Sequence, residues 1–281
     1  MHPYGRPTPP GRIWIISGGG FQNLYHREEP QPPGLPLATH VYPTQFNDKI
    51  PSEADLEAAV HRLHPHRAGV HTHFRMEHFQ KWRREAYSRE KLKTHPQMEI
   101  WLCMVDIVQH LWHKGEIPQE LVCTVIVTIT KGATNTQGIG MLDTLQKVVG
   151  VLIDNRSRTS LQLHDVLHGF RDRRGTMTAI MELNLAQDIS IIEQDPLFLI
   201  FLDLSKAYDT LDRERLLVTL EGYGAGPCLC EILETSWGRQ QVLPRHNSFH
   251  KLAFPATKGT AQGSLVSPTI FDVVVDNIIR T

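Results

Sequence analysis

The feature that most constrains this chain is an unbroken apolar run that leads directly into an acidic residue. Residues 197–202 are all apolar, Pro196 precedes them and Asp203 follows them. A short run without polar alternation, opened by a proline, favours a strand buried on both faces over a helix. A carboxylate at the end of a buried strand is costly unless it is paired or binds a metal ion. Asp203 is therefore the first candidate for a functional residue.

A turn and a helix are predicted to follow this strand. Tyr208 comes five residues after Asp203, and Asp212 is a suitable N-cap. The helix that Asp212 begins would carry a leucine-rich apolar face and would end at Gly222. The pattern is a strand that presents an acid, a turn that presents an aromatic ring, and a helix.

The segment FLDLSKAYD, residues 201–209, resembles the first catalytic motif of reverse transcriptases, in particular those of non-LTR retrotransposons. In that family the aspartate binds catalytic magnesium, and the aromatic residue packs under the sugar of the incoming nucleotide. The resemblance implies that Asp203 is catalytic and a metal ligand, and that Tyr208 excludes ribonucleotides. The alternative is that Asp203 caps a strand and Tyr208 is a core aromatic, because short motifs match freely.

Two further segments resemble the fingers of these enzymes. The first reads W-x-x-G-x-I-P from Trp112, followed by a β-branched run over 122–129 that predicts a strand. The family's lysine at the end of this strand reaches the nucleotide triphosphate, which implies that role for Lys131. In the next segment Gln137 replaces the family's phosphate-contacting arginine. Glutamine has no charge and no bidentate fork, so the chain departs from the family at this phosphate contact.

A Gly-Phe-Arg turn at residues 169–171 resembles the family's third segment. The resemblance implies that Arg171, Arg173 and Arg174 meet template phosphates, and the alternative is a solvent-facing basic turn. Thr176 is the expected N-cap of the helix that follows, which carries apolar residues to Ile192.

Residues 259–268 resemble the family's second palm motif, Q-G-x-x-x-S-P followed by a helix. The resemblance places Gln262 beside the nucleotide and lets the backbone at Gly263 approach template and nucleotide. Ser267 and Pro268 are suited to begin the helix. We expect its inward face to carry the following residues: Phe271, Val274, Val275 and Ile278.

The acids that would complete a two-metal site are not evident in the sequence. The family holds two Mg²⁺ ions with Asp203's counterpart and a later Asp-Asp signature, and no Asp-Asp dipeptide occurs here. Asp272 and Asp276 are four residues apart on one helix face, which predicts a surface pair or a helix contact. We therefore expect a chain truncated before the Asp-Asp motif that is defective in synthesis, with Mg²⁺ as the metal and Mn²⁺ as a possible substitute.

Composition sets broader bounds. The net charge is −1, so the whole chain has no basic signature of nucleic-acid binding. Residues 61–100 are locally basic, with nine Lys and Arg against four Asp and Glu, which fits either a phosphate track or a solvated helix face.

The four cysteines form no C-x-x-C pair and no apolar run is long enough to span a membrane, so we expect an intracellular protein, in the nucleus or the cytoplasm.

Other local patterns predict the remaining elements. Ser52 and Asp55 form a capping box at the start of a helix. Three histidines between 66 and 73 fit a solvated or phosphate-facing loop better than a zinc site. Further expected elements are helices near 76–82, 101–112, 145–153 and 227–237, and a hairpin over 240–258.

Taken together, the sequence predicts an α+β fold made of the fingers and a partial palm of a right-hand polymerase, with an antiparallel palm sheet and packed helices. We expect a Pro- and Gly-rich, poorly ordered leader over 1–46, a fingers-like segment over 47–196 and a partial palm over 197–281. The implied reaction is RNA-templated DNA synthesis, with an RNA template, a DNA primer and a dNTP as partners and no membrane. The alternatives are a non-catalytic nucleic-acid-binding remnant of a retroelement and a fragment that folds poorly.

Overall fold

The computed structural model describes residues 46–64, 75–88, 96–131, 135–204, 207–246, 249–250, 253–261 and 263–280. These residues fall into two compact units. Among the described residues, unit 1 consists of 165–204 with Ala207, and unit 2 consists of the residues before 165 and after 207. The leader up to residue 45 and the histidines at 66, 71 and 73 lie outside the described residues.

Unit 2 begins with three helices, as the sequence predicts. They are α1 (Glu53–Arg62), α2 (Met76–Ser88) and α3 (Pro96–Lys114). The predicted capping box is confirmed, because the Ser52 hydroxyl accepts from the Asp55 amide and the Asp55 carboxylate accepts from the Ser52 amide. The chain leaves α3 through Gly115, whose φ of +64° favours glycine.

One five-stranded mixed sheet follows. It contains β1 (Cys123–Lys131), β2 (Asn135–Met141), β3 (Gln241–His246), β4 (Phe249–His250) and β5 (Phe254–Pro255). The order is β2-β1-β3-β4, with β5 also paired to β3. The predicted hairpin over 240–258 is confirmed by the antiparallel pairing of β3 with β4. The described strands of the predicted palm segment, β3, β4 and β5, pair antiparallel, whereas β1 and β3 run parallel, so the sheet as a whole is mixed.

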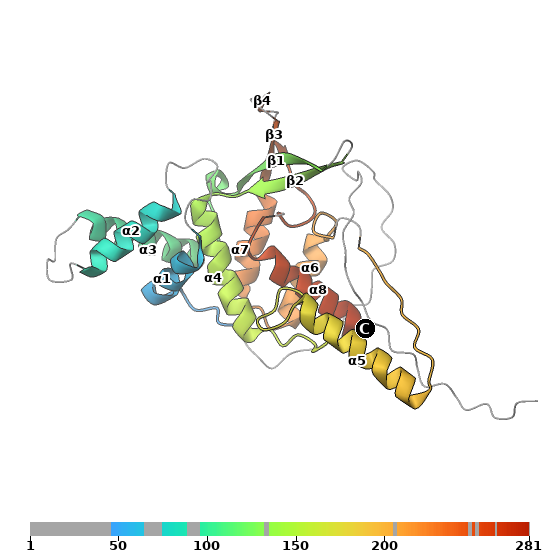
Figure 1. Cartoon of the computed structure of the whole chain (residues 1–281). Helices are drawn as coiled ribbons and strands as arrows, with labels where there is room; N and C mark the ends of the chain where they lie inside the picture. Colours follow the sequence, from blue (N-terminus) through green and yellow to red (C-terminus); the bar gives the residue numbers. More distant parts are fainter. Residues whose placement is uncertain are drawn as a thin grey trace, which may run out of the picture. The chain divides into compact units, whose positions relative to one another are not determined.

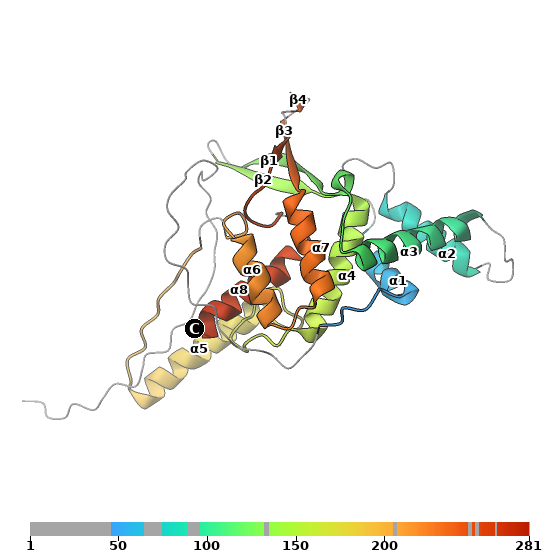
Figure 2. The same ribbon diagram turned by 180° about the vertical axis from the view of Figure 1, so that it is seen from behind.

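The remaining helices of unit 2 are α4 (Thr144–Ser160), α6 (Arg213–Gly222), α7 (Pro227–Gly238) and α8 (Ser267–Arg280), and a short 3₁₀ helix, η1 (Gln119–Leu121), precedes β1. Both views show these four α-helices beneath the β1–β3 sheet (Figure 1 and Figure 2). Asp212 caps α6 as predicted, through bonds from the amides of Glu214 and Arg215. No helix in the described part of the chain is long and apolar enough to cross a membrane.

The buried face of α8 differs from the predicted one. Of the four residues expected to face inward only Phe271 is buried, whereas Ile270 and Val273 are buried on the neighbouring face. Asp272 and Asp276 are also buried, with 5% and 0% of their surface exposed. They are therefore not a surface pair, and the alternative of a helix contact holds.

Two fully buried carboxylates join the helices of unit 2. Asp154 on α4 binds Arg62 at the end of α1 at 2.5 Å and Arg158 at 2.8 Å, and it accepts a hydrogen bond from Thr269 on α8. Buried charges persist only when paired and hydrogen-bonded in this way.

Asp276 on α8 plays a similar role at the other end of the bundle. Its carboxylate accepts from the Tyr223 hydroxyl, the Arg280 guanidinium and the His164 amide, each at 2.5 Å. The polar face of α8, which hydropathy would place in solvent, is thus buried among the helices and makes hydrogen bonds there.

Unit 1 departs most from prediction. Its helix α5 (Thr176–Glu193) begins after an N-cap at Gly175, one residue before the expected Thr176, and none of its residues is buried. The expected buried strand over 197–202 is absent from the structure, because these residues are extended without sheet pairing and Phe198 and Phe201 are 78% and 65% exposed. A strand forms only with hydrogen-bonding partners, and no described strand pairs with this segment.

Removing the charge of Asp154 is expected to destabilise unit 2. In Asp154→Asn, Arg62 and Arg158 lose a fully buried partner, and the free energy of unfolding falls by about 3 kcal/mol. Urea denaturation followed by circular dichroism measures the change. The matched control is Glu116→Gln, which breaks an exposed pair with Arg239 and should change stability by less than about 1 kcal/mol. Equal effects of the two substitutions on the free energy of unfolding would contradict the role of Asp154 as a buried link between α1, α4 and α8.

Candidate nucleotide site

The loop at 259–263 is bound directly to the turn that follows the acidic motif. The Gly259 amide donates to the carbonyl of Leu211 at 2.8 Å, and the Thr260 amide donates to the carbonyl of Tyr208 at 2.9 Å. Two segments about fifty residues apart in sequence therefore lie side by side within unit 2. These bonds bring together two of the five segments that the sequence singles out.

Glycine is required at two positions of this loop. Gly259 has a φ of +75°, and a Cβ there would lie 2.6 Å from the Tyr208 carbonyl oxygen. Gly263 has a φ of +114°, and a Cβ there would overlap with the carbonyl oxygen of Gly140 in β2. The loop thus touches the Tyr208 turn on one side and β2 on the other, at distances that no side chain permits.

Tyr208 is held by α8. Its ring stacks on Phe271, with centroids 5.2 Å apart and planes tilted by 42°. Burial, and then the negative charge of Asp272, raise the pKa of Tyr208 to about 12. The phenol is therefore neutral at ordinary pH, and the half-buried ring forms a fixed platform beside the loop.

Arg213, the first residue of α6, contacts the same loop and was not predicted from sequence. Its Nε donates to the Gly259 carbonyl at 2.8 Å, and burial lowers the pKa of Arg213 to about 10. The only signal in the sequence is its place next to the N-cap Asp212, where an acidic residue would suit the helix dipole better than a basic one. An arginine at this unfavourable helix position indicates that its tertiary contacts, and not the local helix preference, account for its presence.

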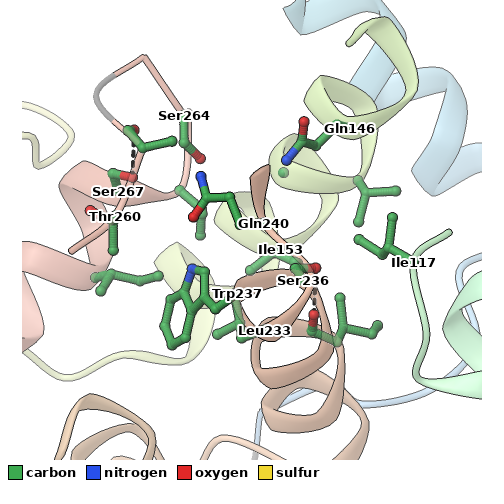
Figure 3. A pocket seen from close by; sticks show the side chains of 16 residues that line it. Ile117, Gln146, Ile153, Leu233, Ser236, Trp237, Gln240, Thr260, Ser264 and Ser267 are labelled. Carbon is green, nitrogen blue, oxygen red and sulfur yellow. Dashed lines mark hydrogen bonds between the residues drawn. The ribbon is translucent and has the colours of Figure 1, made fainter. Parts of the chain in front are cut away.

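A small cavity of about 60 Å³ lies behind the loop (Figure 3). Thr260 and Ser264 lie on one side of it, Gln146 of α4 lies on the other, and Leu233 and Trp237 of α7 lie below. This volume corresponds to about two water molecules. The cavity is too small for a nucleobase.

The β1–β2 hairpin carries the residues predicted to meet the phosphates. Gln137 lies in β2 opposite Ile129, three residues from Gly140 and so about 10 Å along the strand. Lys131 is the last residue of β1 and pairs with Asn135, farther toward the tip. The strand β2 itself was not predicted, because its sequence NTQGIGM has little β-propensity. Gln262 lies outside the described residues.

The other predicted residues belong to unit 1. Asp203 lies in the exposed extended segment. In the turn before α5, Arg171 donates to the Leu167 carbonyl and Arg174 binds the Asp165 carboxylate at 2.6 Å, whereas Arg173 is exposed with a φ of +61°. Of the three arginines, Arg173 is the best placed to meet a phosphate.

The described residues do not make up a metal site by themselves. Among them, no group of three or more His, Cys, Asp or Glu side chains is close enough to hold an ion. Asp203 would supply one carboxylate, whereas a pair of divalent ions needs several oxygen ligands.

The basic tract between residues 61 and 100 is partly used inside unit 2. Arg62 binds Asp154, and Arg83 binds Glu57 at 2.6 Å. Both guanidinium groups thus have carboxylate partners within unit 2, a role that differs from both the phosphate track and the solvated helix face that the sequence left open.

Two comparisons with known proteins give a match. A family model described as reverse transcriptase (RNA-dependent DNA polymerase) matches residues 129–281, more than half of the chain. A Retrovirus-related Pol polyprotein from the type-2 retrotransposable element R2DM of Drosophila melanogaster is 23% identical over 183 residues. That match covers 63% of this chain and 17% of the relative, so the chain spans less than a fifth of the relative's length.

The raised pKa of Tyr208 predicts a late phenol titration. The absorbance at 295 nm of wild type minus that of Tyr208→Phe isolates this group, which should be about one tenth ionised at pH 11, when an exposed tyrosine is about nine tenths ionised. Since the unfolded phenol ionises near pH 10, its contribution to stability is lost as the pH rises from about 10 to 12.

The control for this titration is Asp272→Asn. It should lower the midpoint only in part, because burial is the larger cause of the shift. A midpoint near 10 in the wild type would contradict the placement of the ring.

Proposed function

The chain belongs to the reverse transcriptase (RNA-dependent DNA polymerase) family and is of the non-LTR retrotransposon type, and we propose that its loop at 259–263, its Tyr208 turn and its β1–β2 hairpin form the binding site for an incoming deoxynucleotide. The observation that carries the proposal is the contact of that loop with Tyr208 on one side and Gly140 on the other. A nucleotide on the outer side of the loop would meet an aromatic ring, the exposed Gly263 and the strand that carries Gln137.

Each side of the proposed site has its own role. Tyr208 supports the sugar and disfavours a 2′-hydroxyl, because its ring is fixed against Phe271. Gly263 and Gln262 bound the base, and Lys131 steadies the triphosphate. Gln137 contributes one neutral hydrogen bond to the phosphates, so we expect weaker nucleotide binding than with an arginine there.

Reverse transcriptases use divalent metal ions, and we propose Asp203 as one ligand for Mg²⁺ or Mn²⁺. Bound metal supplies Lewis acidity and charge neutralisation at the phosphates. Two divalent ions need several oxygen ligands, of which Asp203 would supply one carboxylate. The wider proposal is a fingers-like segment over 47–196 and a partial palm over 197–281, preceded by a leader, with RNA template and DNA primer as partners.

A second function, nucleic-acid binding without synthesis, is favoured by one observation. Arg173 presents an exposed guanidinium in a basic turn. Phosphate contacts need no metal, and their affinity falls with added salt. The two functions therefore differ in their dependence on Asp203.

Binding and synthesis can be measured side by side on an RNA template annealed to a labelled DNA primer. We expect salt-dependent binding by fluorescence anisotropy that Asp203→Ala leaves unchanged, and no primer extension with Mg²⁺ or Mn²⁺. Arg173→Ala should reduce the slope of log K against log salt by about 0.7–0.9, as for one lost phosphate contact.

The matched control for Arg173→Ala is Lys114→Ala, which removes an exposed cation at the end of α3 and should leave the slope unchanged. Robust extension that requires Asp203 would show that the chain is an active polymerase. No binding of the template–primer at low salt would contradict both functions.

A further inference from the structure

Arg213 ties three separate segments of unit 2 together. Its four hydrogen bonds run from Nε to the Gly259 carbonyl (2.8 Å), from Nη1 to the carbonyls of Trp237 (2.8 Å) and Ala256 (2.5 Å), and from Nη2 to Gln240 Oε1 (2.5 Å). These partners lie at the start of the loop at 259–263, at the end of α7 and between β5 and the loop. The side chain reaches them from α6, directly after the Tyr208 turn.

All four partners are neutral oxygen atoms. A largely buried cation without a carboxylate partner costs desolvation free energy. The end of α7 offsets part of that cost, because the Trp237 carbonyl lies in its last turn, where the helix dipole is negative. The guanidinium also lies 5.7 Å from the centroid of the Trp237 ring, at the outer range of a cation–π contact.

These bonds exclude a simpler role for Arg213 as a phosphate ligand. A guanidinium has five N–H donors in a fixed plane, and four of them already point to protein oxygens. A bidentate phosphate contact would have to break at least one of these bonds. The geometry is that of a group that holds other segments in place.

The segment that Arg213 holds is the one that contacts Tyr208. Both backbone polar groups of Gly259 are bonded, since its carbonyl accepts from Arg213 and its amide donates to the Leu211 carbonyl. The next residue, Thr260, donates to the Tyr208 carbonyl. The position of the loop relative to Tyr208 therefore depends on three hydrogen bonds made by Gly259 and Thr260. The bond from Arg213 is the one among these three that a charged group donates.

We propose that Arg213 is a positioning residue that fixes the loop at 259–263 against the Tyr208 turn and thereby sets the preference for deoxynucleotides over ribonucleotides. The second half of this inference rests on the proposed function. Tyr208 can reject a 2′-hydroxyl only if the opposite wall of the site is held at a constant distance. Without the guanidinium, the loop keeps its two backbone bonds to the Tyr208 turn and the bond from the Ser267 hydroxyl to the Ala261 carbonyl, and we expect the distance between Gly259 and Tyr208 to become variable.

The test compares Arg213→Met and Arg213→Lys with a matched control, Arg239→Met. Arg239 lies just after α7 and bonds to the Ile117 carbonyl and Glu116, so its loss removes a similar side chain that does not touch the loop. The first readout is hydrogen exchange of the peptide that contains Gly259 and Thr260. We expect exchange at least tenfold faster in Arg213→Met, a smaller increase in Arg213→Lys, and no change in Arg239→Met.

The second readout is the ratio of the dissociation constants for rNTP and dNTP on a chain bound to template–primer. We expect Arg213→Met to reduce this ratio by about tenfold, as for one lost charge-assisted hydrogen bond, and Arg213→Lys to restore part of it. A purely structural role would weaken both nucleotides equally and leave the ratio unchanged. If Arg213→Met does not fold, Gln240→Met removes one of the four bonds and should give the same changes at smaller size.

The outcomes separate the two proposals. If the wild type binds no nucleotide, the proposed function fails, and the exchange readout still decides whether Arg213 holds the loop. Unchanged exchange at Gly259 and Thr260 in Arg213→Met would overturn the inference. Faster exchange with an unchanged rNTP to dNTP ratio would also overturn it, because the loop would then be held without any effect on selectivity.

Discussion

The central interaction of this structure is a backbone contact that only glycine permits. At Gly259 the loop lies against the carbonyl of Tyr208, and at Gly263 it lies against the carbonyl of Gly140. Three segments that are far apart in sequence meet there, and all three lie in the part of the chain that the reverse transcriptase family model matches. Because the contact is between backbones, any side chain at these positions would have to separate the segments. The helices α6 and α8 contact this meeting point directly, through Arg213 and Phe271.

Charged groups inside unit 2 do much of this holding. Asp154 ties α1 and α8 to α4, Asp276 ties α8 to Tyr223, and Arg213 ties α6 to the loop and to the end of α7. Each polar network is directional, so it fixes orientation as well as distance. An apolar core of the same size would bury the helices equally well but would constrain the position of the loop less. This use of buried charge explains why α8 presents Asp272 and Asp276 inward, where hydropathy predicts a polar outer face.

Sequence patterns predicted the features that depend on neighbouring residues. They failed for the features that depend on contacts with residues far away in the sequence. The Ser52 capping box, the Asp212 N-cap and the hairpin over 240–258 are confirmed, because each depends on neighbours within a few residues. The strand β2 was missed, since its pairing with β1 overrides a weak propensity. The predicted buried strand over 197–202 was wrong, because a strand also needs a partner that its own sequence does not contain. In the candidate site, Tyr208 and Gly263 were predicted from motifs, whereas Arg213 was not, because its four partners are main-chain and amide oxygens that leave no pattern in the sequence.

The most direct measurement for this account is the affinity of the chain, bound to an RNA template and DNA primer, for the complementary dNTP in Gly263→Ala and in Gly238→Ala. A Cβ at Gly263 would press on the Gly140 carbonyl from a left-handed backbone, whereas a Cβ at Gly238 meets nothing within 4 Å. The account predicts that Gly263→Ala binds the nucleotide at least tenfold more weakly than wild type while Gly238→Ala binds it equally well. Unchanged affinity in Gly263→Ala, or no nucleotide binding by the wild type, would contradict a site formed by this loop, Tyr208 and β2.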